Sequence, residues 1–226
     1  MNFYAGSSWF ELSHQIHPGM QTFPVPWHRP VDFIALGTLE EVGRRTTHVH
    51  IGTHSGTHID APSHFIKTGA AISDIPLERF SSRAVMLDLK DIEAGQTVDI
   101  DNLMSTAVMS SLPGDSILLN FGWSKHYGTE RYYPDQPFLT EAGMEYLLSF
   151  RPAMIGYDMA MPDDPKNGRG SDCDSPMHKL ALGNDVLLLE NLKFPNDIPE
   201  SFELLAFPLN LRDLDGSPVR AVGRIT

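Results

Sequence analysis

The chain has 226 residues, 41% hydrophobic and 20% charged, which is the composition of an ordinary globular protein with one substantial core. Its 17 basic and 29 acidic residues give a net charge of −12, which argues against a nucleic-acid partner and an anionic membrane surface. No run approaches the roughly 20 apolar residues that span a bilayer.

Cys173 is the only cysteine, so no internal disulfide can form, which fits a reducing compartment. Asp172 and Asp174 flank Cys173, and their negative charges oppose ionisation of its thiol, which favours a bystander over a nucleophile. The first residues also lack a basic region followed by a long apolar one. We expect a cytoplasmic protein with a single domain over residues 1–226.

Residues 9–13 predict a short strand. Four prolines and one glycine interrupt residues 18–30, so this segment cannot form a regular helix or a central strand. The resulting rigid loop carries the aromatic residues Phe23 and Trp27. Two interpretations have equal weight: these side chains line a pocket for a flat substrate, or they cap the core from the surface.

Residues 46–53 alternate, with Val49 and Ile51 on one face and His48 and His50 on the other. This period of two predicts a half-buried strand. The two histidines are interpreted as exposed or interface residues rather than as ligands.

The middle of the chain alternates strands and helices. We predict strands at 83–89, 116–121 and 153–158, and helices at 99–111 and 140–150. Asp99 or Asp101 offers the N-cap of the first helix, and Thr140 caps the second.

A long loop at 161–174 follows, and long loops in compact domains are often functional. Its charged residues Asp163, Asp164 and Arg169 are interpreted as a solvated run rather than a lid. Ser175 and the proline after it then begin a short helix that ends at residues 183–185, with His178 in its first turn.

Residues 186–192 predict a strand in which Glu190 stands within an apolar run. A buried carboxylate is costly unless it is paired or bound to a metal. Two last strands are predicted near 203–210 and 217–225. Strands mixed with three helices, without internal repeats, predict an α/β or α+β domain.

The densest group of potential metal ligands is His54, His58, Asp60 and His64. Zinc and manganese accept imidazole and carboxylate ligands, and the small residues between them let the side chains converge. A histidine-rich surface turn is the alternative. The density of the group favours a metal site.

The string His-x-Gly-Thr-His-x-Asp-x-Pro-x-His-Phe at residues 54–65 resembles the signature of the cyclase family of metal-dependent hydrolases. This family includes bacterial kynurenine formamidases and isatin hydrolases. Stretches at 12–14, 155–158, 190–192 and 216–222 are similar too, so the resemblance runs nearly end to end. It implies a mixed α/β domain with a central barrel-like sheet flanked by a few helices, and a homodimer or homotetramer.

The resemblance also implies a ligand set. His54, His58 and Asp60 would hold a first ion, and His178 with Glu190 would complete a second position or the outer wall of a one-metal site. The cofactor would be a divalent metal, Zn²⁺ or Mn²⁺, as one or two ions.

His64 matches the residue that donates and accepts protons in these enzymes, and Glu190 would be a ligand or a base. Phe23 falls where the formamidases place a substrate-contacting tryptophan in a Trp-Pro-Gly-Asp run. This chain has Phe-Pro-Val-Pro at 23–26 instead, so the resemblance favours a reaction class more than one substrate.

These features predict a metal-dependent hydrolase that cleaves a C–N amide bond of a small aromatic substrate, either a cyclic amide or an N-acyl or N-formyl aryl amide. A divalent metal lowers the pKa of bound water from about 15.7 to about 7, which supplies hydroxide at neutral pH. The alternatives are an arylformamidase specific for N-formylkynurenine, a cyclase or dehydratase of polyketide-like substrates, and a metal-bearing binding protein without turnover. No Gly-x-Ser-x-Gly elbow supports serine catalysis.

Overall fold

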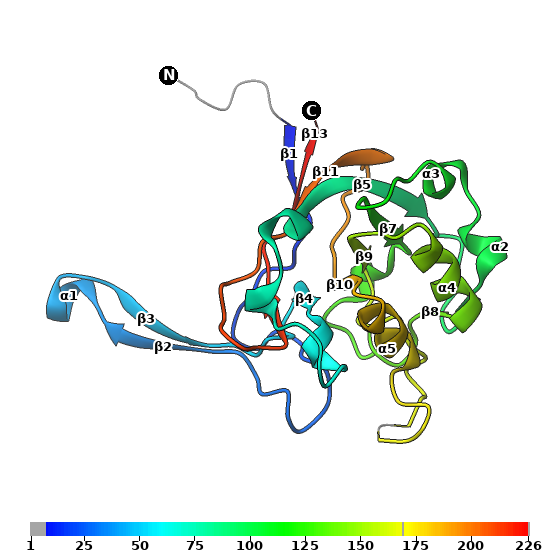
Figure 1. Cartoon of the computed structure of the whole chain (residues 1–226). Coiled ribbons are helices and arrows are strands. Elements are labelled where there is room, and N and C mark those ends of the chain that lie inside the picture. Colours follow the sequence, from blue (N-terminus) through cyan, green and yellow to red (C-terminus); the bar gives the residue numbers. More distant parts are fainter. Residues whose placement is uncertain (1–7, 169, 226) are drawn as a thin grey trace.

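The computed structural model describes residues 8–168 and 170–225, and its centre is one curved mixed sheet of nine strands (Figure 1). In spatial order these are β1 (Ser8–Glu11), β13 (Val222–Ile225), β11 (Ser201–Leu205), β5 (Ser81–Asp88), β7 (Ser116–Asn120), β9 (Met154–Tyr157), β10 (Leu187–Glu190), β4 (His58–Asp60) and β12 (Gly216–Pro218). The strands β5, β7, β9 and β10 are parallel, and those on either side of them are antiparallel.

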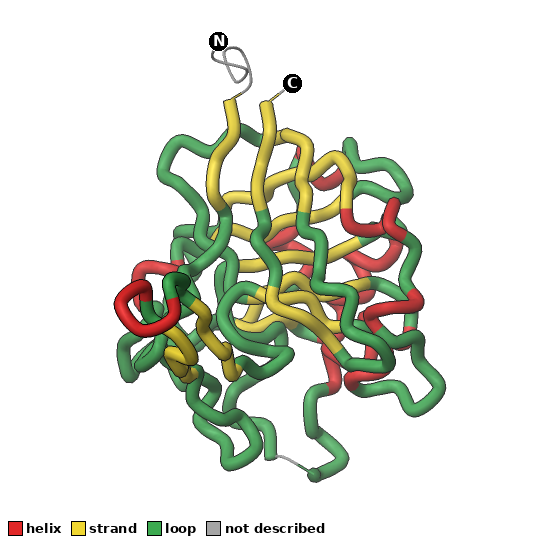
Figure 2. Tube along the Cα trace, turned by 90° about the vertical axis from the view of Figure 1, so that its left-hand side faces the viewer, coloured by secondary structure: helices red, strands yellow, loops and turns green. Residues whose placement is uncertain are grey.

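The sheet curls so that segments beyond its edge strands meet more central ones. Ser13, just after β1, bridges to Leu192, just after β10. Pro208 bridges to Val219, which joins the segments that follow β11 and β12. The predicted mixed fold with a barrel-like sheet is confirmed, as a half-barrel. Figure 2 shows the curved sheet with most of the helical segments on the right of the view and one helical turn on the left.

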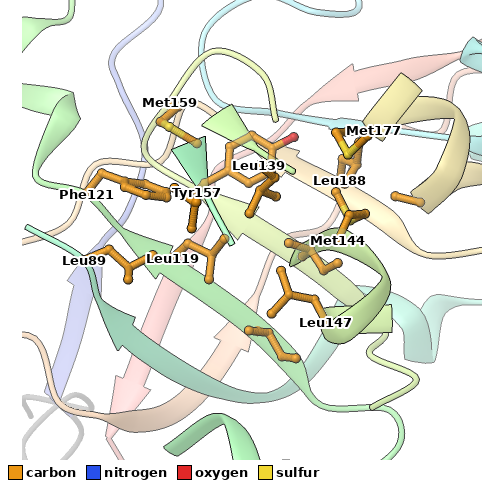
Figure 3. Packing of buried hydrophobic residues seen from close by; sticks show 14 of the residues in the cluster. Leu89, Leu119, Phe121, Leu139, Met144, Leu147, Tyr157, Met159, Met177 and Leu188 are labelled. Atoms are coloured by element: carbon orange, nitrogen blue, oxygen red, sulfur yellow. The ribbon is translucent and has the colours of Figure 1, made fainter. Parts of the chain in front are cut away.

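Alternation along the central strands divides the core between the two faces of the sheet. On one face Leu188 lies with Met144 and Leu147 of α4 (Glu141–Ser149) and Met177 of α5 (Pro176–Gly183) (Figure 3). On the other face Leu189 belongs to a second cluster. The helices therefore cover only one face. None of the described helices has the length and apolar character to cross a membrane.

A two-stranded arm projects from this body, built of β2 (Asp32–Gly37), the single turn α1 (Leu39–Val42) and β3 (Thr46–His50) (Figures 1 and 2). All of its strand residues except Gly37 are exposed. The strand predicted at 46–53 is present as β3, but the prediction that it is half-buried is wrong, because its pairing is with β2 of the arm and all five of its residues are exposed. The arm is called the β2–β3 arm below.

The predicted helix at 99–111 is two single turns, α2 (Ile100–Leu103) and α3 (Thr106–Met109). Asp99 caps the first turn as predicted, but Met104 is extended, with a ψ of 104°, and ends it. The last predicted strand is likewise divided into β12 and β13, because its first part pairs with β4 and its second part pairs with β11.

The other predicted strands and helices are present within a few residues. The remaining short elements are the strands β6 (Thr97–Val98) and β8 (Phe138–Leu139), and the 3₁₀ turns Pro62–His64, Ile72–Asp74, Leu77–Phe80 and Trp123–His126.

Thr140 caps α4, and its Oγ1 accepts a hydrogen bond from the backbone N–H of Gly143 at 3.0 Å. We expect Thr140→Ala to lower the free energy of unfolding by about 1 kcal/mol, because the N–H loses its acceptor at the start of the helix. Urea denaturation measures the change. Thr140→Ser keeps the acceptor and is the matched control, so an equal loss in both variants would contradict the capping role.

Candidate metal centre

Strand pairing brings three of the predicted site residues together. In the antiparallel register of β4 and β10, His58 lies opposite Glu190 and Asp60 lies opposite Leu188. Side chains opposite each other share a face of the sheet, so His58, Asp60 and Glu190 point to the same side. This is the helix-covered side, at the carboxyl end of the parallel strands, where open α/β sheets bind ligands.

The first turn of α5 adds His178, which is buried like the other three residues. Nε2 of His58 lies 3.3 Å from Asp60 Oδ1 and 3.4 Å from Glu190 Oε2. Nε2 of His178 lies 3.6 Å and 3.2 Å from the other oxygens of these carboxylates, Asp60 Oδ2 and Glu190 Oε1.

The spacing of these donor atoms fits a divalent ion. Two ligands about 2.1 Å from a tetrahedral zinc ion stand about 3.4 Å apart. The four nitrogen–oxygen distances between His58, Asp60, His178 and Glu190 lie close to this value. No arginine or lysine of the described chain lines the surrounding cavity. The negative charge of the two buried carboxylates is therefore left for imidazoles and a cation to balance.

Hydrogen bonds around the group orient its side chains. Nδ1 of His58 lies 2.8 Å from the carbonyl oxygen of Gly56, to which it donates, and Nδ1 of His178 lies 2.5 Å from Asp163 Oδ2. Each contact directs the Nε2 atom of its imidazole inward. The Tyr157 hydroxyl donates to Glu190 Oε1 at 2.7 Å.

These contacts also set the protonation of the group. Burial opposes a charge on His178, but hydrogen bonds to Asp163 and Glu190 outweigh burial and raise its pKa well above the ordinary value. Burial likewise opposes ionisation of Asp60, but His54 and His64 outweigh it and lower the pKa of Asp60 well below the ordinary value.

His54 differs from the other four predicted ligands in that one of its ring nitrogens contacts Asp215. Its Nδ1 lies 2.6 Å from Asp60 Oδ1 and its Nε2 lies 2.8 Å from Asp215 Oδ2, which are hydrogen-bond distances. Burial opposes a charge on this ring, but Asp60 and Asp215 outweigh burial and raise its pKa to about 10.

His64 lies on the 3₁₀ turn just after β4, with its ring centroid 3.9 Å from that of His54. Its Nδ1 is 3.1 Å from the same Asp215 Oδ2. Two candidate groups of metal ligands therefore share Asp60. One is His58, Asp60 and Glu190, the other is His54, Asp60 and His64, and in each the ligand atoms lie within 4.8 Å of one another.

Sequence reasoning missed three residues that contact the predicted ligands: Tyr157, Asp163 and Asp215. Asp163 is buried against His178, so its interpretation as a solvated charge is wrong. Arg169, from the same predicted run, lies outside the described residues. The only local sequence signal that Asp163 could be a site residue was its position next to Pro162.

The group opens into a cavity of about 480 Å³. Phe23, Trp27, Phe65 and Tyr133 contribute aromatic side chains to its lining. Phe23 meets Tyr133 edge to face at 5.1 Å and also packs on the core, so both interpretations of this loop hold for Phe23. Trp27 is 68% exposed and lies at the rim.

Residues interpreted as bystanders do not line the cavity. His48 and His50 are exposed on the β2–β3 arm, as predicted. Cys173 is an exposed free thiol and is absent from the cavity lining.

Comparison with known proteins places this geometry in a family. A kynurenine formamidase of Bacillus cereus is 27% identical over 228 residues, covering 96% of this chain and 98% of the relative. Isatin hydrolase A from Labrenzia aggregata, bound to benzyl benzoate, superposes with a TM-score of 0.86 at 22% identity and covers 97% of this chain and 94% of its own. An isatin hydrolase bound to the product analogue thioisatinate has a TM-score of 0.87 at 20% identity, with coverages of 97% and 92%.

The family model described as a putative cyclase matches residues 10–164, which include the loop with Phe23, the whole of β4, and Asp163. The match spans more than half of the chain, and the formamidase and isatin hydrolase comparisons extend nearly end to end. The chain therefore belongs to the cyclase family.

Proposed function

We propose that this protein is a metal-dependent hydrolase that cleaves a non-peptide C–N amide bond of a small aromatic substrate. One observation carries the proposal. Two imidazole nitrogens and two carboxylates, all buried, stand at ligand spacing beside a cavity with aromatic walls. The cyclase-family relatives support the same reaction class, because they are named for opening or cleaving amides of aromatic compounds.

We propose that His58, Asp60, His178 and Glu190 hold the ion. His54 is the fifth predicted ligand, and it would join them on losing its proton toward Asp60. A bound ion would lower the pKa of water and polarise the amide carbonyl. Zn²⁺ and Mn²⁺ both accept this set, and we propose one or two ions of either metal.

The chain's own residues account for the other parts of the reaction. The aromatic side chains of the cavity bury the substrate ring and exclude water around it. His64 takes a proton from the attacking water and gives it to the departing nitrogen. Both oxygens of Glu190 lie within 3.4 Å of imidazole nitrogens, which supports a role as ligand rather than as base.

Arylformamidase activity on N-formylkynurenine is the second candidate. The end-to-end similarity to a kynurenine formamidase favours it. The Phe-Pro-Val-Pro run at 23–26 favours a different aryl substrate, because Phe23 lines the cavity where the formamidases have tryptophan. The cyclase or dehydratase and the binding protein without turnover are outcomes of the test below.

We further propose that the protein is a homodimer or homotetramer assembled through the β2–β3 arm. An isolated two-stranded hairpin is at best marginally stable in water, so the arm needs a surface to pack on. Its exposed large apolar side chains are Phe33, Ile34, Leu36, Leu39, Val42 and Val49.

The charge of the β2–β3 arm supports a second copy of this chain as the surface on which the arm packs. Residues 32–50 carry two arginines and three acidic side chains, a net charge of −1 out of −12 for the chain. The arm therefore approaches an acidic copy with little repulsion. Its nineteen residues approach the roughly 20–30 residues per side of a standard interface. The cytoplasmic location remains a prediction from the sequence, with which the lone cysteine is consistent.

For the reaction, we expect purified protein to hydrolyse formanilides or isatins, to lose this activity with a chelator, and to regain it with Zn²⁺ or Mn²⁺. Turnover is followed by absorbance, and bound metal by elemental analysis. Undiminished turnover in metal-free protein would contradict the mechanism. Bound metal without turnover on formanilides, isatins and cyclic imides would favour a binding protein, or a cyclase or dehydratase of polyketide-like substrates.

For proton transfer, we expect His64→Ala to retain its metal and lose about 10²–10⁴-fold in kcat, the usual contribution of a general acid or base. The matched control is His17→Ala, because His17 is exposed, lies outside the β2–β3 arm and does not line the cavity. Wild-type kcat in the His64 variant would assign proton transfer to another group.

For assembly, we expect Leu36→Glu to convert the oligomer to a monomer in sedimentation velocity, because a charge replaces an apolar side chain that is 63% exposed on the arm. Leu77→Glu is the matched control, since Leu77 is 69% exposed outside the arm. A wild-type monomer at working concentration would contradict the proposal.

A further inference from the structure

A turn near the end of the chain reaches back to the site. Asp215 is separated from His54 and His64 by more than 150 residues, yet one of its oxygens, Oδ2, contacts both. The distances are 2.8 Å to His54 Nε2 and 3.1 Å to His64 Nδ1. No role for this carboxylate follows from the ligand set, because it does not belong to either candidate group of metal ligands.

The backbone of this turn is fixed independently of the Asp215 side chain. The carbonyl oxygen of Asp215 accepts from the N–H of Ala61 at 2.9 Å, and the carbonyl of Leu214 accepts from the N–H of Ile72 at 2.8 Å. At Gly216 an added Cβ would lie 2.6 Å from the carbonyl oxygen of Ile59, so the chain passes very close to β4. The Asp215 side chain itself is 40% exposed. Backbone contacts therefore fix the position of Asp215, and the turn does not need the Asp215 side chain to keep its conformation.

The contact with Asp215 determines which nitrogen of His64 is available. A neutral imidazole has one N–H and one lone pair. Because Nδ1 faces a carboxylate, the proton belongs on Nδ1, and the lone pair is on Nε2. His64 lines the cavity, so a histidine held in this tautomer offers its basic nitrogen at the site.

We propose that Asp215 is the positioning residue of His64: it holds the imidazole in the tautomer and orientation that let Nε2 transfer protons. This inference rests on the proposed amide hydrolysis. His64 takes a proton from water at Nε2 and passes it to the nitrogen of the breaking C–N bond. The Nδ1–H stays hydrogen-bonded to Asp215 throughout, so the carboxylate neither gains nor loses a proton.

The second contact of Asp215 suggests a competing route that the experiment must separate. Since Oδ2 also accepts from His54 Nε2, loss of the carboxylate could act through His54 on metal binding. Metal content distinguishes the two routes. Action through His64 leaves the metal in place, whereas action through His54 lowers occupancy.

The test is a double-mutant cycle in the metal-loaded protein. We expect Asp215→Ala to lower kcat by about 10–100-fold with unchanged KM and metal content, the usual cost of removing a group that orients a site histidine. We expect the double variant with His64→Ala to be no slower than His64→Ala alone, because residues that act as a unit are non-additive. Asp215→Asn keeps an acceptor oxygen, but its amide can also donate to Nδ1 and favour the other tautomer, so we expect this variant to be slower than wild type as well.

Asp213→Asn is the matched control. Asp213 lies in the same turn, is exposed, and has a φ of 60°, which asparagine tolerates. This variant makes the same change of charge and should retain wild-type kcat.

A second measurement does not depend on turnover. Nitrogen-15 NMR of histidine-labelled protein reports the tautomer of His64, which we expect to remain Nδ1–H in wild type and Asp213→Asn and to become mixed in Asp215→Ala. Multiplicative losses in the cycle, metal loss in Asp215→Ala, or an unchanged tautomer would each overturn the inference. A wild-type protein without hydrolysis would overturn the proposed function instead, and the NMR result would still decide the role of Asp215.

Discussion

The antiparallel register of β4 against β10 is the constraint on which the site depends. It sets His58 opposite Glu190 and Asp60 opposite Leu188, so three potential ligands share a face with the core residues under α4 and α5. A slip of one residue would turn His58 and Asp60 to the opposite face. The register is held because Ile59, between them, is fully buried in the cluster on that opposite face.

The surrounding hydrogen bonds convert this placement into chemistry. Buried imidazoles have two possible tautomers, and a site needs one of them. The Gly56 carbonyl and the Asp163 carboxylate direct the Nε2 atoms of His58 and His178 inward. These partners come from the loop before β4 and the loop before α5, segments that are more than a hundred residues apart in the chain. The conformation of these two loops is therefore as necessary for orienting the ligands as the strands and helix that carry them.

The sequence predicted the strongly patterned parts well and the long-range parts poorly. Strand β7 and helix α4 were predictable because an apolar run and the Thr140 cap are local signals. Strand β4 was missed because it is three residues long between Gly56 and Pro62, and only pairing with β10 and β12 makes it a strand. The ligands of the 54–65 motif were visible as a cluster. Asp215 was not, because nothing near it in the chain indicates that its partners lie more than 150 residues away.

Fold and metal binding are interdependent in this arrangement. His58 and Asp60 come from the first third of the chain, whereas His178 and Glu190 follow more than a hundred residues later, so the ligand set exists only after the sheet has formed. The buried carboxylates in turn destabilise the fold unless positive charge faces them. Without a cation, protonated imidazoles must supply that positive charge, as the raised pKa values of His54 and His178 indicate. A divalent ion replaces those protons and binds only the folded chain, so its binding free energy adds to the stability of the same sheet that assembles its ligands.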